Sequence, residues 1–72
     1  SVSNLEIIKR RLKEQKMYLS LIEKLYDAGK INYKTVLTAL AELNYVKGLE
    51  QEQRAAVVYS IVVLYKSLGG GW

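Results

Sequence analysis

Residues 25–37, with the sequence LYDAGKINYKTVL, decide the fold, because they contain a helix stop followed by a helix start. Gly29 suits the position just past a helix end, where φ is often positive and a Cβ would be strained. Three residues later, Asn32 is suited to cap a new helix with its side-chain oxygen. Ile31 and Val36, on either side of that cap, have the spacing of a hydrophobic staple. The stretch therefore predicts a turn between two helices.

The residues before the turn have the pattern of a coiled-coil helix. Ser3 and Glu6 are spaced as a capping box, so we expect the first helix to begin near Asn4 and to end at Ala28, over about 37 Å. Gln15 takes one core position of a seam that is otherwise apolar. Two interpretations stay open: Gln15 fixes the register or faces a water-filled space, or it is tolerated at the edge of the core. The apolar positions of the seam are Leu5, Ile8, Leu12, Leu19, Ile22 and Tyr26.

The residues after the turn keep one apolar face as far as Leu68, if two polar positions are accepted. Inside a helix Gly48 costs about 1 kcal/mol relative to alanine, so it suggests a close packing contact or a slight bend rather than a stop. Glu50 and Arg54 are a favourable pair four residues apart. We therefore expect a second helix over 33–68, about 54 Å long. Its apolar face is Val36, Ala39, Leu43, Val46, Val57, Ile61, Leu64 and Leu68, with Glu50 and Gln53 as the polar breaks.

Residues 55–68 are apolar nearly all round and would project beyond the shorter first helix. This run of about 14 residues is too short to span a bilayer, which needs about 20, so no membrane-spanning segment is expected. Its β-branched residues would also suit a buried strand, but continuity with the preceding helix favours a helix. Because nothing in the 72 residues would cover this run, we expect the chain to oligomerise or to be a piece of something larger.

Composition limits the classes of function. The 72 residues include no histidine, cysteine or proline and carry a formal net charge of +4. A general base would have to be a carboxylate or a lysine with a shifted pKa, and no thiol nucleophile is present, so we expect neither enzymatic activity nor a metal or cofactor. Glu23 and Asp27, four residues apart, could form a paired-carboxylate site. The alternative is a repulsive surface pair that is relieved by Lys24 or Lys30.

One basic cluster lies in the first helical pattern. We interpret it as a solvated helix face, and the alternative is a contact with phosphate or lipid, which needs several basic residues on one side. No nucleic acid partner is expected. The cluster consists of Lys9, Arg10, Arg11, Lys13 and Lys16.

Two stretches resemble outer-membrane factors, the TolC-like channels of tripartite efflux pumps. The tail LYKSLGGGW at 64–72 is similar to the C-terminal signature of that family. The turn is also similar to the family's pattern, with LYDAG at 25–29, then Tyr33 and VLTA at 36–39. Residues 1–24 agree only as a generic coiled-coil helix. The family often has an aspartate or glutamine beside the alanine that matches Ala39. This chain has Thr38 and Leu40 there, so the family's polar contacts at these positions are not assigned to it.

The resemblance implies a trimer, in which each protomer contributes long helices to a periplasmic tunnel and strands to an outer-membrane barrel. This chain would be the last helix pair, with its turn at the periplasmic tip of the tunnel. The resemblance assigns Tyr26, Gly29 and Tyr33 to that tip, where a periplasmic adaptor protein binds, and a structural role to residues 69–72. It also implies export of drugs or metals and a location in the outer membrane and periplasm of a Gram-negative bacterium.

We therefore expect an all-α antiparallel helical hairpin over 1–72, with helices at about 4–28 and 33–68, a turn at 29–32 and a tail at 69–72. The polar start lacks the features of a signal peptide and is typical of the middle of a longer protein, so we expect a fragment of a larger channel protomer. The alternative is a free-standing, self-associating hairpin that acts as a protein-binding module. In either case we expect oligomer packing through Val57, Ile61, Leu64 and Leu68.

Overall fold

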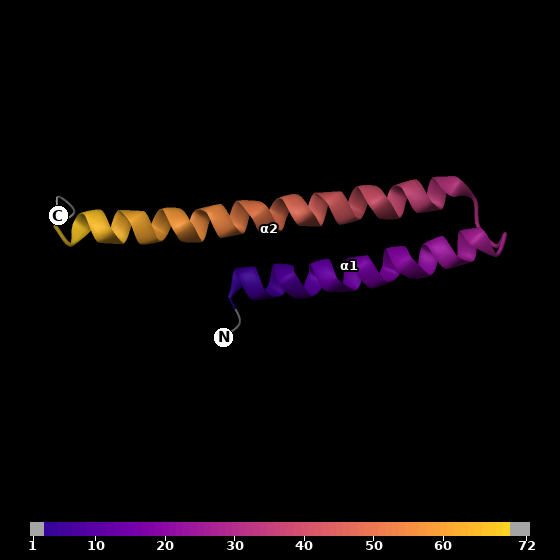
Figure 1. The fold of residues 1–72 in the computed structure, drawn as a ribbon, viewed down its shortest axis with the longest axis horizontal. Coiled ribbons are helices and arrows are strands. Elements are labelled where there is room, and N and C mark those ends of the chain that lie inside the picture. Colours follow the sequence, from indigo (N-terminus) through magenta and orange to yellow (C-terminus); the bar gives the residue numbers. More distant parts are fainter. Residues whose placement is uncertain (1–2, 70–72) are drawn as a thin grey trace.

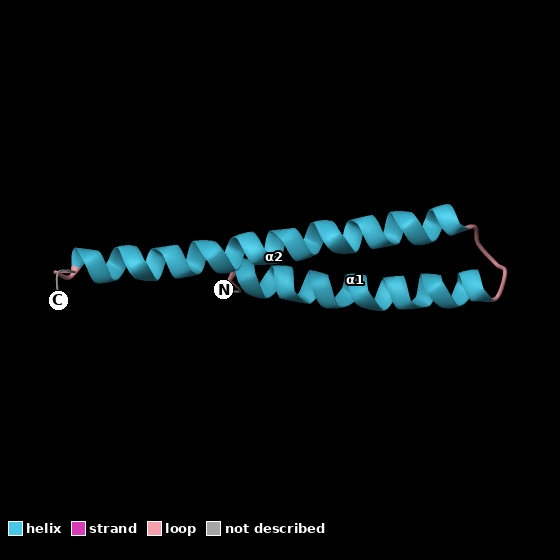
Figure 2. Ribbon diagram, turned by 45° about the horizontal axis from the view of Figure 1, so that its top comes forward, coloured by secondary structure: helices cyan, strands magenta, loops and turns pink. Residues whose placement is uncertain are grey.

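The computed structural model describes residues 3–69, which form two α-helices joined by a short turn (Figure 1). Helix α1 spans Asn4–Asp27 and helix α2 spans Tyr33–Ser67. The two helices lie side by side and run in opposite directions, and the described part of the chain contains no strand (Figure 2). The expected all-α antiparallel hairpin is therefore confirmed. Residues 70–72 of the tail, to which the resemblance gives a structural role, lie outside the described residues.

Side-chain caps fix the starts of both helices. Ser3 Oγ accepts a hydrogen bond from the backbone N–H of Glu6 at 3.2 Å. Asn32 Oδ1 accepts one from the N–H of Thr35, also at 3.2 Å. These bonds satisfy N–H groups that have no partner within the first turn of a helix. Each helix ends one residue before its expected end, because Ala28 and Leu68 take the C-cap positions.

The turn is a Schellman motif centred on Gly29. The backbone N–H of Lys30 donates to the carbonyl of Leu25 and that of Gly29 donates to the carbonyl of Tyr26, both at 2.9 Å. Gly29 has a φ of 74°, in the left-handed region that favours glycine. The positive φ expected at this residue is therefore confirmed, and it lets the chain reverse immediately after α1.

The hydrophobic core lies between the helices and is densest in the half near the turn. Ile22, Val36 and Ala39 form one buried cluster, and Ile31 packs against it as a staple residue should. The seam differs from expectation at Tyr26, which is exposed instead of buried, because it lies in the last turn of α1 opposite Tyr33, the first residue of α2, where the paired part of the helices ends. Further along, Leu43 and Val46 are buried, and Leu5, Ile8 and Leu12 are partly buried.

Helix α2 continues far beyond the start of α1. It has 35 residues against 24, so α1 begins beside the middle of α2 and the C-terminal part of α2 projects alone (Figure 1). The molecule is accordingly a rod, 62 Å long and 23 × 13 Å across. Residues 55–67 are helical, as expected, and all of them are exposed. A Cβ built on Gly48 would meet open space, so the close packing contact considered for that glycine is absent from the described residues.

Candidate interaction surfaces

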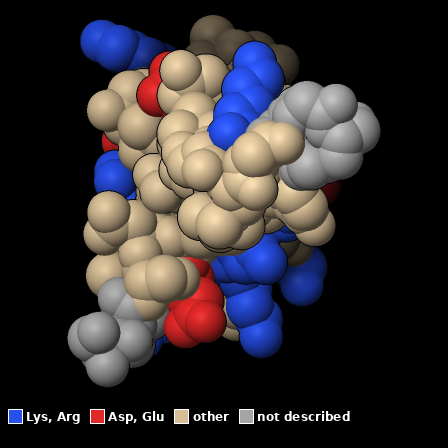
Figure 3. Space-filling model, turned by 90° about the vertical axis from the view of Figure 1, so that its left-hand side faces the viewer, with Lys and Arg blue, Asp and Glu red and all other residues tan. Residues whose placement is uncertain are grey.

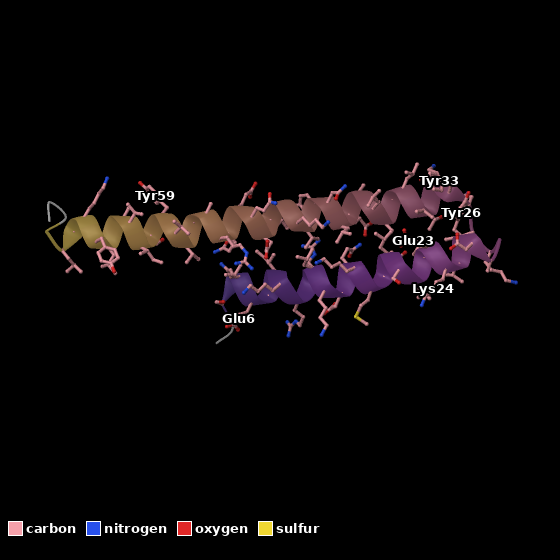
Figure 4. The ribbon with its side chains drawn as sticks, in the orientation of Figure 1. Glu6, Glu23, Lys24, Tyr26, Tyr33 and Tyr59 are labelled. Carbon is pink, nitrogen blue, oxygen red and sulfur yellow. The ribbon has the colours of Figure 1, made fainter. Side chains whose placement is uncertain are left out.

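Two tyrosines come together at the tip of the hairpin. Tyr26 lies in the last turn of α1 and Tyr33 is the first residue of α2, and their ring centroids are 5.3 Å apart at an interplanar angle of 58° (Figure 4). The pair therefore spans the two helices beside the turn at Gly29. Both rings remain exposed. Partly exposed tyrosines suit a binding surface, because each combines an apolar ring with a polar hydroxyl. The three residues assigned to the tip thus lie together at one end of the rod.

An open groove runs between the helices next to this aromatic pair. It has a volume of about 550 Å³. Leu19, Val36 and Leu40 give it apolar walls, and the exposed residues Glu23 and Asp27 give it an acidic edge. The two carboxylates considered as a catalytic pair are therefore surface groups beside the groove. The remaining lining residues are Ser20, Lys24, Tyr26 and Tyr33.

The opposite face of the tip half carries a second apolar surface. Ile22 is buried at the centre of the seam, and Leu19, Glu23 and Tyr26 line the groove on one side of it. Helical spacing places other apolar residues of α1 on the other side of Ile22, where they form a ridge. Leu21 in this ridge is 55% exposed. The ridge consists of Tyr18, Leu21 and Leu25, of which Leu25 is partly buried and packs against the core cluster.

A polar contact crosses the seam near its middle. The Gln15 side chain, partly buried in the apolar seam, donates a hydrogen bond from Nε2 to Oε2 of Glu42 at 2.9 Å. This contact favours the interpretation that Gln15 fixes the register, because a side-chain bond between helices is made in one alignment only. The sequence did not identify Glu42 as the partner, because the residue opposite Gln15 depends on the register between α1 and α2.

Charged groups away from the tip are exposed, except for Glu50, which is half-buried. Every residue of the basic cluster on α1 is exposed, which agrees with a solvated helix face. The expected pair between Glu50 and Arg54 is confirmed, with Oε2 and Nε 2.8 Å apart. Such a pair contributes little on a surface, about 0.3–0.5 kcal/mol.

The projecting part of α2, residues 55–67 together with the cap residue Leu68, is termed the overhang below. Seen end-on from this side, the molecule shows mainly uncharged side chains at its centre (Figure 3). Val57, Ile61, Leu64 and Leu68 are all exposed, and Ile61 is 49% exposed. The overhang therefore leaves a long run of mostly apolar side chains open to water. Within residues 3–69, neither helix is long and apolar enough to cross a membrane.

Comparisons with known proteins link this hairpin to efflux pumps. No family model matches the chain, and no solved structure matches it significantly. Its curated relatives include two proteins of Pseudomonas putida, the solvent efflux pump outer membrane protein SrpC and the toluene efflux pump outer membrane protein TtgI. Each is 42% identical to the chain over 57 residues. The chain is similar to outer membrane proteins of efflux pumps.

The resemblance to TolC-like outer-membrane factors is therefore confirmed. Both relatives are outer membrane proteins by name, in agreement with the expected location, and their names describe pump components rather than enzymes. The matched region covers 79% of this chain but only 12% of each relative. The chain thus spans a small part of the length of these proteins.

Proposed function

We propose that the chain is a helical hairpin of an outer-membrane efflux channel and contributes to the periplasmic helical tunnel and its tip. The observation that carries this proposal is the 42% identity over 57 residues to two outer membrane proteins of efflux pumps. The family resemblance suggests export of drugs or metals. The names of these two relatives favour apolar organic solvents as the exported class.

The surfaces of the hairpin support a place in the wall of a larger helical assembly. A wall element must contact neighbours on both sides, and the tip half carries the groove on one face and the ridge on the other. The overhang adds an apolar surface that needs cover from further helices. We assign this packing to Val57, Ile61, Leu64 and Leu68, against helices of the same protomer or of the trimer.

The tip is proposed to meet a periplasmic adaptor protein. Tyr26 and Tyr33 present their rings at the end of the rod, and the left-handed Gly29 keeps the connection between them short. Tyrosine side chains have few rotatable bonds, so they lose little conformational entropy on binding.

A free-standing, self-associating hairpin that acts as a protein-binding module is the second candidate. The exposed overhang favours it, because two or more copies could cover that surface without any other protein. Only the first candidate predicts that the chain supports efflux when it is built into a channel protein.

A segment exchange tests the channel proposal. In a Pseudomonas putida strain without its toluene efflux pump outer membrane protein, the gene is supplied with the 57 matched residues replaced by those of this chain. We expect toluene tolerance close to that given by the unaltered gene. The matched control carries the same exchange with Leu43→Asp, which puts a charge into the buried seam and should abolish tolerance. A chimera that accumulates in the outer membrane at the normal level without giving tolerance would contradict the proposal.

The same chimera tests the tip. Tyr26→Ala with Tyr33→Ala should reduce tolerance and cross-linking to the adaptor, while the amount of chimera in the membrane stays unchanged. Tyr45→Ala is the control, since Tyr45 is similarly exposed but lies on α2 away from the turn. Equal losses from the tip and control variants would show that the tip has no special role in binding.

A further inference from the structure

One face of the overhang continues the seam of the hairpin. At about 3.6 residues per turn, four apolar residues of the overhang fall on the same side of α2 as the buried seam residues Leu43 and Val46. Unlike those seam residues, all four are exposed. They are Val57, Ile61, Leu64 and Leu68, and they are termed the open face below.

Helix α1 stops short of the open face. The Gln15–Glu42 bond places these two residues at a similar height along the rod. Counting outward from this pair brings Asn4, the first residue of α1, beside Gln53 of α2. Gln53 is half-buried, and every described residue after it is exposed, so the covered part of α2 ends at this height. Beyond it, the place that α1 fills along the rest of α2 is open.

We propose that the overhang of a second copy of this chain fills this place and runs antiparallel to the first overhang, so that the tips of the two hairpins point in opposite directions. Each overhang then covers the other in an isologous, two-fold contact. The inference rests on the self-association described above as the second candidate function, and it adds which partner covers the overhang and in which direction that partner runs. It concerns the chain by itself and not the chain built into a channel.

The position of α1 decides the direction. A parallel second copy on the open face would carry its own α2 toward the same tip, into the space that α1 of the first copy occupies (Figure 1). An antiparallel copy carries its α2 away from the first hairpin and meets no such obstacle. Only the antiparallel arrangement therefore covers both overhangs without displacing α1.

The spacing of the open face sets the register of the pair. Its residues are separated by steps of four, three and four, which read the same in both directions. In an antiparallel pair, Val57 of one copy therefore meets Leu68 of the other, and Ile61 meets Leu64. Leu68 of the second copy then lies about four residues, or about 6 Å, beyond the start of α1. The C-terminal end of one helix faces the N-terminal end of another there, which brings opposite partial charges together.

The polar groups of the overhang permit its burial. Lys66 is the only charged residue of the overhang, and helical spacing places it on the side away from the open face. The hydroxyl of Ser60 donates to the carbonyl of Ala56 at 2.9 Å, and that of Ser67 donates to the carbonyl of Val63 at 3.0 Å. Both hydroxyl donors keep these partners when a second helix covers them, so their burial leaves no donor unsatisfied.

Disulfide cross-linking tests the direction, because the chain contains no cysteine. Val57→Cys and Leu68→Cys chains are mixed and oxidised. The antiparallel contact should give a disulfide-linked heterodimer in roughly tenfold excess over the homodimer of either variant, since two copies of either position lie about 16 Å apart along the axis. Leu68→Cys mixed with Tyr59→Cys is the control and should stay at background. Tyr59 lies on the side of α2 away from α1 (Figure 4).

Small-angle X-ray scattering of the unaltered chain provides a readout without substitutions. Two rods of 62 Å that overlap only along their overhangs should have a maximum dimension of about 100 Å. Two copies that lie side by side in the same direction would stay close to the 62 Å of one rod. The shorter dimension in a sample that sediments as a dimer would overturn the proposal.

A pair of substitutions tests the open face itself. Ile61→Ser with Leu64→Ser in both cysteine chains should reduce the heterodimer to background. Tyr59→Ser with Val62→Ser removes two exposed side chains from other sides of the overhang and should leave the heterodimer unchanged. A heterodimer that persists without Ile61 and Leu64 would overturn the proposal.

The remaining outcomes separate the direction from self-association. Homodimers of Val57→Cys or Leu68→Cys as abundant as the heterodimer, in a chain that does associate, would overturn the antiparallel direction alone. A helical chain that sediments as a monomer at every concentration would overturn the proposal together with the self-association on which it rests. Neither result bears on the channel proposal, which the segment exchange tests.

Discussion

Gln15 and Glu42 are joined across the seam by a hydrogen bond, in which Gln15 Nε2 donates to Glu42 Oε2 at 2.9 Å. Gln15 is partly buried in the apolar seam and Glu42 is exposed, so the bond lies at the edge of the seam. A polar residue at a seam position selects one register and lowers stability relative to an apolar residue. Gln15→Leu should therefore raise the free energy of unfolding by up to about 1 kcal/mol while allowing other registers. Thermal unfolding followed by circular dichroism measures the first effect. Distances between spin labels at the exposed positions Lys13 and Asn44 measure the second.

Gln15→Glu is the matched control for register selection. It keeps the size of the side chain but places a second carboxylate beside Glu42, so the helix pair should lose stability near neutral pH. A single narrow distance distribution in Gln15→Leu would contradict a role of the Gln15–Glu42 bond in selecting the register.

Gly29 controls the reversal of the chain through its backbone. Gly29→Val should destabilise the hairpin by roughly 1–2 kcal/mol, because a β-branched residue resists positive φ. Nothing lies within 4 Å of a Cβ built on Gly29, so this cost comes from the backbone and not from a clash. Gly48→Ala is the control: its Cβ also meets open space, but in a helix interior, and it should stabilise by up to about 1 kcal/mol. Equal melting temperatures for Gly29→Val and the parent chain would mean that the turn is built differently.

Asn32 determines where α2 begins. Its Oδ1 accepts from the Thr35 N–H at 3.2 Å and lies 3.3 Å from Thr35 Oγ1. Asn32→Ala should cost about 1 kcal/mol, because the Thr35 N–H loses its capping partner. Asn32→Asp keeps an acceptor at the N-cap and should retain most of the stability. Chemical unfolding of the three chains compares these free energies, and a loss in Asn32→Asp as large as that in Asn32→Ala would argue against the capping bond.

Substitutions in the overhang should change self-association without changing the folding of the hairpin. Ile61→Ser removes apolar surface that is not buried in the chain, so it should weaken self-association and leave the helix pair intact. Leu43→Ser, by contrast, alters a buried seam residue and should cost about 2–5 kcal/mol. Sedimentation and circular dichroism of both variants distinguish the two effects. If Ile61→Ser associates as strongly as the parent chain, the overhang is not part of the self-association interface.

Local sequence rules account for most of the fold. The caps at Ser3 and Asn32 and the left-handed turn at Gly29 depend on residues close in sequence, so their types and spacing were sufficient to predict them. The helical state of the overhang followed from its continuity with the preceding helix. The exposure of that surface followed from the unequal lengths of the two helices.

The candidate surfaces were predicted less completely, because they depend on how the helices are paired. The sequence singled out Tyr26 and Tyr33 through a family resemblance, but the contact between their rings required the geometry of the turn. Tyr26 was placed in the seam by its spacing and is exposed, since the spacing does not show which residues the opposite helix covers near the turn. The groove and the ridge lie on opposite sides of Ile22, and which residues of α1 face the groove is fixed by the rotation of α1 against α2.

The central claim is that the overhang is an interface, and the mass of the isolated chain together with its helix content tests this most directly. Analytical ultracentrifugation and circular dichroism should show an assembly heavier than the 8.2 kDa monomer, with a melting temperature that rises with protein concentration. An 8.2 kDa monomer that is fully helical through residue 67 and melts at the same temperature at every concentration would contradict the claim.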